Sequence, residues 1–231
     1  MYALIIAGGE GERLRPLTTD RPKPMVLVAG RPILEHQIEW LHAQGVSNVI
    51  LLCGYRSDVI REHFGNGSRF GLEIEYSVED QPLGRGGALR QGSTLLPGSE
   101  QVLVATNGDV LTDQALAPLV ERHRQKEATA TVMLAPLHSP YGIARVARNS
   151  TIESFDEKPI LPYWINAGVY ILSRDFFQLL PERGDHEDTT FPELSKRGKL
   201  FGFKSKAYWR AVDSFKDLAE AERDLSQSSR A

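Results

Sequence analysis

The feature that most constrains the first part of the chain is a short apolar run that stops at two glycines. Residues 2–7 are almost all apolar and are followed by Gly8-Gly9, a pattern typical of a strand that helices cover on both faces. Apolar residues then recur at helical spacing over 34–41, and Gly45 supplies a C-terminal stop. Residues 46–53 repeat the buried-strand pattern. The sequence therefore predicts a β-α-β start.

The rest of the first half continues the alternation of strands and helices. Ser57 is placed to cap a short helix, and residues 72–78 alternate apolar with polar side chains, as a strand with one wet face does. Residues 101–106 form another buried strand, and residues 116–123 an amphipathic helix that Thr112-Asp113 is placed to cap. This order favours a mainly parallel sheet, whose ligands gather at the carboxyl ends of the strands.

The pattern changes after residue 128. Residues 129–135 predict a strand, and residues 143–147 and 151–155 are two more strand-like runs about the turn residues 148–150. We interpret this part as an inserted β-hairpin region. A further strand is expected over 165–172.

Two helices are expected near the C-terminus. Thr190 and Glu193 have the spacing of a capping box, and Ser214 with Asp217 opens the last helix. No repeat or linker divides the chain. We therefore predict one α/β domain over residues 1–231, with a Rossmann-like, mainly parallel sheet flanked by helices.

Charge and cysteine content exclude several classes of partner. The chain has 30 acidic and 27 basic residues and a formal net charge of −3. It therefore has no excess of basic residues for binding a nucleic-acid backbone. The single cysteine, Cys53, lies in an apolar run and cannot form an internal disulfide, as in proteins of reducing compartments. No run reaches the ~18 apolar residues of a membrane-spanning helix. We expect a cytoplasmic protein with no nucleic-acid or membrane partner.

The motif that says most about function comes directly after the first strand. It is Gly8-Gly9-Glu10-Gly11-Glu12-Arg13-Leu14-Arg15. Its glycines let backbone N–H groups approach a phosphate, and its arginines add positive charge. It lacks the Lys-Ser/Thr of a Walker loop, and Leu14 stands where a dinucleotide fingerprint needs glycine. A strand-ending turn with solvated arginines is the plain alternative. Arg21-Pro22-Lys23-Pro24-Met25 favours a phosphate site, because its prolines restrict the backbone that carries Lys23.

These motifs resemble the signature of the sugar-phosphate nucleotidyltransferases, Gly-Gly-x-Gly-x-Arg-Leu-x-Pro-Leu-Thr followed by Pro-Lys-Pro-Met. The resemblance covers nearly the whole chain and is closest in pattern to mannose-1-phosphate or heptose-1-phosphate guanylyltransferases. It continues in the family's order through Pro82-Leu83-Gly84, Asn107-Gly108-Asp109, Asp156-Glu157-Lys158-Pro159, Ile165-Asn166-Ala167-Gly168 and residues 209–213. Such enzymes join a nucleoside triphosphate to a sugar 1-phosphate and release pyrophosphate.

The resemblance implies a division of the chain between the two substrates. Residues 1–127 would bind the nucleotide and residues 128–231 the sugar phosphate, with the hairpin region on the sugar-phosphate side. The positions that match nucleotide-binding residues are Ala7, Gly8, Gly9, Gly11, Arg13, Glu79, Pro82, Gly84, Gly87 and Asn107. Those that match sugar-phosphate-binding residues are Tyr141, Gly142, Glu157, Lys158, Asn166 and Gly168.

The transfer itself would need positive charge, because both reactants are anions and the transition state gathers negative charge at the α-phosphate. Arg15 and Lys23 match the family's catalytic cations, and Asp109 and Asp213 match its magnesium ligands. Two carboxylates with triphosphate oxygens would give the hard oxygen ligands that Mg²⁺ prefers. An isolated aspartate after a strand is more often a cap or a turn former. The six histidines lack metal-ligand spacing, and no serine or cysteine sits in a nucleophile-elbow context.

The residues expected to contact the sugar phosphate and the base also have simpler structural explanations. Neighbouring Glu157 and Lys158 also fit a surface ion pair of little energy. Glu79 occupies the family's base-reading position, and a carboxylate only accepts hydrogen bonds, so it suits the two adjacent donors of guanine. We therefore expect GTP. The alternative interpretation of Glu79 is a solvent-exposed residue at the end of a strand. Arg85 departs from the small residue or threonine that the family usually has after Pro-Leu-Gly.

Three other functions are weighed against the guanylyltransferase. A uridylyl- or thymidylyltransferase would use the same motifs with another base. A catalytically silent subunit that senses nucleotide sugars is disfavoured by the joint presence of Arg15, Lys23, Asp109 and Asp213. A glycosyltransferase would commonly show closely paired aspartates, which Asp109-Val110-Leu111 lacks. A homo-oligomer is compatible with each of these functions.

Overall fold

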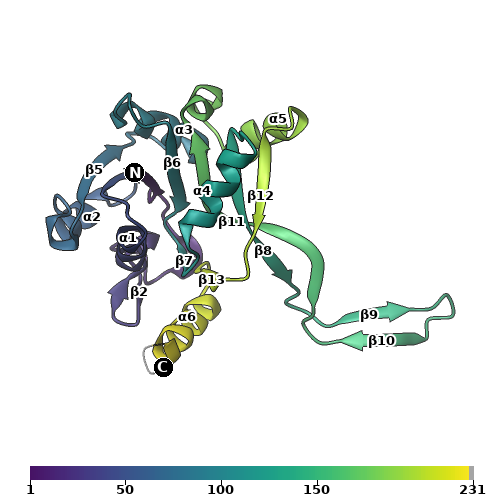
Figure 1. Ribbon diagram of the computed structural model, residues 1–231. Helices are drawn as coiled ribbons and strands as arrows, with labels where there is room; N and C mark the ends of the chain where they lie inside the picture. The colour runs from purple at the N-terminus through teal and green to yellow at the C-terminus, as the bar shows by residue number, and fades with distance from the viewer. Residues whose placement is uncertain (229–231) are drawn as a thin grey trace.

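The computed structural model describes residues 1–228, and a seven-stranded sheet forms its centre (Figure 1). From one edge to the other the strand order is β12-β8-β11-β6-β1-β4-β5. In chain order the strands are β1 (Tyr2–Ile6), β4 (Asn48–Cys53), β5 (Glu73–Val78), β6 (Val102–Asn107), β8 (Ala130–His138), β11 (Ile160–Ser173) and β12 (Leu200–Lys204). Only β11 runs antiparallel to its neighbours in this sheet. The predicted α/β fold with a mainly parallel sheet is confirmed.

Helices cover both faces of the sheet because successive strand residues point to opposite sides. On one face, Ala3 and Ile5 of β1 join a core with α1 (Ile33–Ala43), α2 (Ser57–Phe64) and α4 (Leu116–Gln125). On the other face, Leu4 joins a core with α3 (Gly84–Gly92), α5 (Thr190–Lys196) and the 3₁₀ helix η5 (Arg174–Leu179). A strand buried on both faces accounts for the continuous apolar run at the start of the chain.

Smaller elements complete the architecture. Short strand pairs are formed by β2 (Leu27–Val28) with β3 (Arg31–Pro32) and by β7 (Val110–Thr112) with β13 (Trp209–Ala211). The remaining 3₁₀ helices are η1 (Glu12–Leu14), η2 (Lys23–Met25), η3 (Ser68–Phe70) and η4 (Ser93–Leu95). The last helix is α6 (Phe215–Ser228). No helix among residues 1–228 has the length and apolar character needed to cross a bilayer.

Helix ends test the sequence predictions closely. α1 ends before Gly45, which has a φ of 81°, as the glycine stop predicts. The expected Ser57 cap is wrong, because α2 begins at Ser57 itself after Arg56 and has no side-chain cap. The Thr190 capping box is also wrong, because the Thr190 hydroxyl donates to the Leu179 carbonyl oxygen from inside α5.

The last helix has the start that the sequence predicts. The Ser214 hydroxyl oxygen accepts from the Asp217 backbone N–H at 3.3 Å, and the Asp217 carboxylate accepts from the Asp213 backbone N–H at 3.2 Å. The Ser214 bond caps the helix start, and the Asp217 bond differs from a regular capping box because it reaches the N–H of Asp213, one residue before the cap. The cap also fixes the backbone of Asp213.

Among the α-helices and the strands of the central sheet, α3 and β12 escaped the sequence analysis. α3 contains four glycines in nine residues, a composition with poor helix propensity. A side chain at Gly86 or Gly87 would lie within 3.0 Å of the backbone of residues 182–186. The glycines are therefore explained by close packing of that segment on the helix, which helix periodicity does not report.

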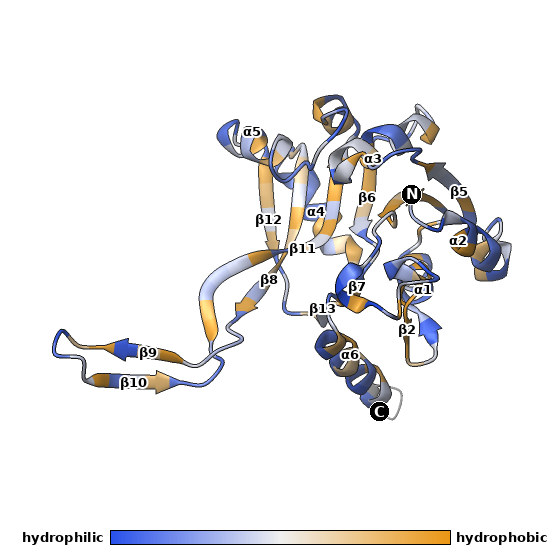
Figure 2. Ribbon diagram, turned by 180° about the vertical axis from the view of Figure 1, so that it is seen from behind, coloured by the Kyte–Doolittle hydropathy of each residue, from blue (hydrophilic) through white to orange (hydrophobic). Residues whose placement is uncertain are grey.

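The inserted hairpin is confirmed and reaches far from the sheet. β9 (Ile143–Val146) pairs antiparallel with β10 (Ile152–Asp156), and every residue of both strands is exposed. At the base of the hairpin, the Ser139 backbone N–H donates to the Pro159 carbonyl oxygen and joins the two segments that lead into it. Figures 1 and 2 both show the hairpin projecting beyond the helices and the sheet. We call residues 139–159 the arm.

Candidate functional site

A cleft of about 1070 Å³ lies at the carboxyl ends of the parallel strands. Gly8 follows β1, Gly54 follows β4, Glu79 follows β5 and Asp109 follows β6, and all four residues line the cleft. Because β11 is antiparallel, its residues before Val169 reach the same edge of the sheet. The sheet therefore collects side chains from both halves of the chain at one place, where ligands of such sheets usually bind.

The glycine loop folds tightly over the end of β1. Gly11 has a φ of 69°, and a Cβ atom there would lie 2.8 Å from Cβ of Lys23. The Lys23 backbone N–H donates to the Gly9 carbonyl oxygen, and the Thr18 hydroxyl donates to that of Gly11 at 2.8 Å. These contacts require glycine at position 11 and hold the segment that carries Lys23 against the loop.

A charged centre lies in the cleft where the loop meets the ends of β6 and β13. Nζ of Lys23 is 2.5 Å from an oxygen of Asp109 and 2.5 Å from an oxygen of Asp213. The Arg13 guanidinium is 2.7 Å from the same Asp213 oxygen. The Lys23 side chain is only 13% exposed. The carboxylates of Asp109 and Asp213, which are far apart in the sequence, thus both contact the Lys23 ammonium. The Arg13 guanidinium lies beside them.

The backbone around Asp109 is held from several sides. The Gly108 N–H donates to the Ile6 carbonyl oxygen, and the Val212 N–H donates to that of Asp109 at 2.9 Å. The Gln37 amide donates to the carbonyl oxygens of Asn107 and Val110 at 2.6 and 2.7 Å. These bonds come from β1, from α1 and from the residue after β13, so the backbone that carries Asp109 is held by the core of the fold.

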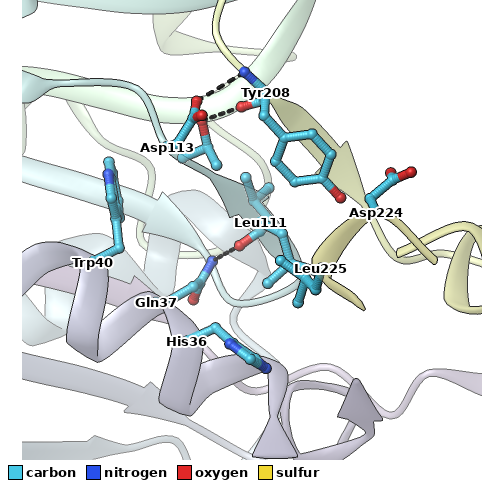
Figure 3. Close-up of a pocket in the computed structure, with 10 residues that line it drawn as sticks. His36, Gln37, Trp40, Leu111, Asp113, Tyr208, Asp224 and Leu225 are labelled. Atoms are coloured by element: carbon cyan, nitrogen blue, oxygen red, sulfur yellow. Dashed lines mark hydrogen bonds between the residues drawn. The ribbon is translucent and has the colours of Figure 1, made fainter. Parts of the chain in front are cut away.

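A second hollow of about 290 Å³ lies behind this loop. Figure 3 shows Gln37 pointing from α1 to the loop backbone, with Asp113 and Tyr208 above it. The Asp113 carboxylate accepts from the Tyr208 N–H, and the Thr112 hydroxyl donates to the Tyr208 carbonyl oxygen. The expected Thr112-Asp113 cap is therefore wrong, because α4 begins at Leu116, whose N–H donates to the Gln44 side chain.

Glu79, the expected base reader, lies half-buried in the cleft wall. One carboxylate oxygen accepts from the Leu83 backbone N–H at 3.0 Å. The other lies against Gly8 and Gly54, where an added Cβ would come within 3.0 and 2.6 Å of it. Gly54 therefore leaves room for this carboxylate. One oxygen supports the turn into α3, and the Glu79 side chain lines the cleft.

Arg85, the departure from the family pattern, is neutralised by two carboxylates. Its guanidinium lies 2.7 Å from Asp185 and 3.0 Å from Glu187. Its backbone N–H also donates to Asp185. Hydrogen bonding from Arg85 lowers the pKa of Asp185, whereas burial raises the pKa of Glu187. Arg85 and Asp185 both line the cleft beside Glu79, so the pair forms part of the wall expected to face the base.

The sugar-phosphate residues divide into two groups. Asn166 and Gly168 line the cleft, and the Asn166 side chain accepts from the Gly168 N–H and donates to the Tyr170 hydroxyl. Gly168 has a φ of 70°, and a Cβ there would lie 2.7 Å from the Asn107 amide. The second group lies at the base of the arm, outside the cleft lining, and consists of Tyr141, Gly142, Glu157 and Lys158.

At the base of the arm, a Cβ on Gly142 would meet Glu157 at 2.9 Å. The Lys158 ammonium lies 3.6 Å from the Glu157 carboxylate, and both side chains are more than half exposed. Tyr141 is 74% exposed. The structure brings these residues together but leaves them apart from the Lys23 centre.

Other expected residues differ in how they meet the cleft. Among the nucleotide-binding positions, Gly8, Gly9, Arg13, Glu79, Pro82, Gly84 and Asn107 line it, whereas Ala7, Gly11 and Gly87 support it from behind. Arg15 does not line the cleft, and its guanidinium lies 3.3 Å from Glu10 and about half exposed. Glu10 does line it, so Arg15 stands beside the cleft mouth.

Trp209 and Tyr55 are aromatic cleft residues to which the sequence analysis assigned no role. The Trp209 indole N–H donates to the Ala167 carbonyl oxygen at 2.7 Å and ties β13 to β11. The Tyr55 hydroxyl donates to the Thr19 carbonyl oxygen at 2.8 Å and ties the segment after the glycine loop to the end of β4. A lone aromatic residue outside a periodic segment gives no sequence signal for such a contact.

Comparison with known proteins defines the class of this fold and site. A family model described as nucleotidyl transferase matches residues 2–228. The chain belongs to the nucleotidyl transferase family. The predicted family resemblance is confirmed.

Particular relatives carry more specific names. The chain is 37% identical over 225 residues to a mannose-1-phosphate guanyltransferase of Yarrowia lipolytica, covering 94% of this chain and 62% of that protein. It is 35% identical over 231 residues to a mannose-1-phosphate guanylyltransferase of Mycobacterium tuberculosis, covering 96% and 64%. It thus spans less than two thirds of these curated relatives. HddC from Yersinia pseudotuberculosis has a similar structure, with a TM-score of 0.78, 26% identity and coverage of 97% and 99%.

Proposed function

We propose that the protein transfers GMP from GTP to a sugar 1-phosphate, mannose 1-phosphate or a related heptose 1-phosphate, and releases pyrophosphate. The observation that carries this proposal is the convergence of Lys23, Asp109 and Asp213 beside a glycine loop at the sheet edge. The names of the relatives favour guanine and mannose. The Glu79 carboxylate on the cleft wall suits the adjacent donors of guanine.

The chain's own groups account for the reaction without a covalent intermediate. The backbone of Gly8 and Gly9, with Arg13, would hold the triphosphate, and Lys23 would face its α-phosphate. An oxygen of the sugar phosphate forms the new bond to the α-phosphorus, and the bond to the bridging oxygen breaks as pyrophosphate leaves. The attacking oxygen is already anionic, so no general base is required. What the protein supplies is position and positive charge.

A divalent cation fits the same place. The two carboxylate oxygens that contact Lys23 lie no farther apart than twice 2.5 Å, close enough for one cation to bind both. Asp109 and Asp213 would hold Mg²⁺, and when bound it would neutralise charge on the triphosphate. The positive charges of Lys23 and Arg13 offset part of the electrostatic repulsion between the two carboxylates.

The two halves of the cleft suggest where each substrate lies. We assign residues 1–127 to the nucleotide and residues 128–231 to the sugar phosphate, within one nucleotidyltransferase domain. Asn166 and Gly168 would contact the sugar in the cleft. Tyr141, Gly142, Glu157 and Lys158 would reach it from the base of the arm, with Lys158 on the acceptor phosphate.

The setting of the protein is also part of the proposal. Cys53 is buried as core filler, and burial raises the pKa of its thiol to about 12, so it is poorly suited to redox chemistry. This fits a reducing cytoplasm. A homo-oligomer is compatible with the open cleft.

The proposal is tested by measuring pyrophosphate release from GTP, UTP, dTTP and ATP with several sugar 1-phosphates. We expect the fastest release with GTP and mannose or heptose 1-phosphate, no release after chelation, and recovery with Mg²⁺. Full activity in a metal-free assay would remove Asp109 and Asp213 as cation ligands. Preference for UTP or dTTP would favour the uridylyl- or thymidylyltransferase instead, and binding without turnover would favour the sensing subunit.

A further inference from the structure

Arg85 lines the cleft, but the mechanism above gives it no part. It is the second residue of α3, and its side chain is 43% exposed. A small residue or threonine is usual at this position in the family, so the transfer itself does not require a guanidinium there. The role that is left for Arg85 is recognition of one of the substrates.

The turn between β5 and α3 places Arg85 on the same wall as Glu79, the expected base reader. The Leu83 backbone N–H donates to the Glu79 carboxylate at 3.0 Å, so the chain folds back onto the end of β5 two residues before Arg85. Gly84, the residue between them, has a φ of 76°, and a Cβ there would lie 2.8 Å from the Gly184 backbone. Close packing thus fixes the start of α3 beside Glu79, and both side chains line one cleft.

The charge of Arg85 is balanced within the protein. One terminal nitrogen of its guanidinium donates to the Asp185 carboxylate at 2.7 Å, and the other lies 3.0 Å from that of Glu187. The two carboxylates repel a triphosphate and offset the attraction that Arg85 alone would exert on it. Arg85 is therefore suited to a neutral group of a ligand, for which the direction of a hydrogen bond matters more than charge.

The same contacts hold the guanidinium in place and leave it donors for a ligand. Asp185 accepts from the Arg85 backbone N–H at 2.8 Å as well as from its side chain, so the residue is restrained at both ends. A guanidinium carries several N–H groups in one plane, whereas Asp185 and Glu187 each contact one terminal nitrogen. A donor group that is restrained before binding loses little side-chain entropy when a ligand arrives.

We infer that Arg85 reads the guanine of GTP by donating to the O6 and N7 acceptors, while Glu79 accepts from N1–H and N2–H. The inference rests on the proposed function and adds a second specificity-determining residue to it. Guanine presents its two donors and its two acceptors side by side, so an acceptor side chain next to a donor side chain matches it. An arginine fork contacts the same O6 and N7 pair in protein–DNA complexes. Adenine has a donor in place of O6, and uracil has a single acceptor on this edge.

The test compares GTP with two analogues that each lack one of these groups. 7-Deaza-GTP has a C–H group in place of N7, and inosine triphosphate lacks the 2-amino group. Binding of each to the full chain is measured by calorimetry with Mg²⁺, so the result does not depend on which sugar phosphate is used. The wild-type protein should bind either analogue roughly 10-fold more weakly than GTP, because each analogue leaves a polar group of the cleft wall unpaired.

Variants assign each loss of affinity to one residue. Arg85→Met should bind GTP roughly 10- to 100-fold more weakly than wild type, and it should bind 7-deaza-GTP as well as GTP. It should still discriminate against inosine triphosphate, whereas Glu79→Gln should still discriminate against 7-deaza-GTP. Arg90→Met is the matched control, because Arg90 lies on the same helix with a side chain 45% exposed and does not line the cleft. It should bind all three triphosphates as wild type does, and circular dichroism checks the fold of each variant.

The wild-type comparison needs no variant, so it stands even if Arg85→Met folds poorly. A wild-type protein that prefers GTP to UTP but binds 7-deaza-GTP equally well would overturn the role of Arg85 and leave the proposed function intact. Discrimination against 7-deaza-GTP that persists in folded Arg85→Met would do the same, as would an equal loss of GTP and UTP in that variant. Tighter binding of UTP or dTTP than of GTP by wild type would overturn the guanine assignment, and the role of Arg85 with it.

Discussion

Replacing Lys23 by methionine is the most informative perturbation of the cleft, because the Lys23 ammonium contacts both carboxylates. The new side chain is unbranched and only one atom shorter, and it carries no charge. In the wild-type protein the ammonium occupies the place between the carboxylates that a divalent cation would take. We expect the variant to lose turnover by ~10² or more, the scale for removing an electrostatic contact to the transition state, and to gain affinity for a divalent cation.

The size of the gain follows from the geometry. Two unit negative charges about 5 Å apart repel by about 3 kcal/mol at an effective dielectric constant of about 20. Arg13 remains beside Asp213, whose side chain is 37% exposed, and screening there reduces the repulsion to about 1–2 kcal/mol. A cation that binds both carboxylates relieves this repulsion. The nucleotide-free variant should therefore bind Mn²⁺ about tenfold more tightly than wild type.

The assay is Mn²⁺ binding followed by electron paramagnetic resonance without nucleotide, alongside turnover by pyrophosphate release. Lys126→Met serves as the control, because Lys126 is an exposed lysine at the end of α4. It should change neither quantity. Unchanged or weaker Mn²⁺ binding by Lys23→Met would refute the idea that the ammonium competes with the cation, whatever happens to turnover.

Three further outcomes are expected. Glu79→Gln turns one acceptor into a donor facing guanine, so kcat/KM for GTP should fall roughly 10- to 100-fold, with a smaller change for UTP; equal losses for all triphosphates would contradict the base assignment. Arg15→Ala should lower kcat by ~10² with the fold intact if Arg15 leaves Glu10 for a phosphate, and near-normal turnover would remove it from the mechanism. Burial lowers the pKa of His186 from its ordinary value to about 4. Below pH 6.5 the unfolded chain then binds more protons than the folded chain does. The free energy of unfolding, measured by urea titration, should therefore fall by up to about 2 kcal/mol from pH 7 to pH 5. It should fall less in the His186→Gln variant.

The sequence was sufficient for features that depend on local pattern. The apolar run before Gly8 marks a strand covered on both faces, and the alternation over residues 72–78 marks a strand with one solvent-exposed face. That β5 lies at the edge of the sheet was learned from the structure. Both follow from which faces are buried, which periodicity reports directly. The hairpin turn at residues 148–150 was equally readable, because its residues favour turn conformations.

Features that depend on distant contacts could not be read in this way. The glycines of α3 make sense only once residues 182–186 pack on them. Asp113 resembles a helix cap in sequence, but its carboxylate accepts from the Tyr208 N–H, nearly a hundred residues away. The meeting of Asp109 and Asp213 at Lys23 was reached through a family resemblance, since the spacing of these residues in the chain carries no such information.

The central claim is that the Lys23 centre serves nucleotidyl transfer to a sugar phosphate, and product analysis by phosphorus NMR tests it most directly. GTP, mannose 1-phosphate and Mg²⁺ are incubated with the protein, and the phosphorus resonances of products are followed. The account predicts GDP-mannose and pyrophosphate in equal amounts, with neither formed when the sugar phosphate is omitted. Release of free phosphate from GTP, or no product with mannose or heptose 1-phosphate under any condition, would contradict it.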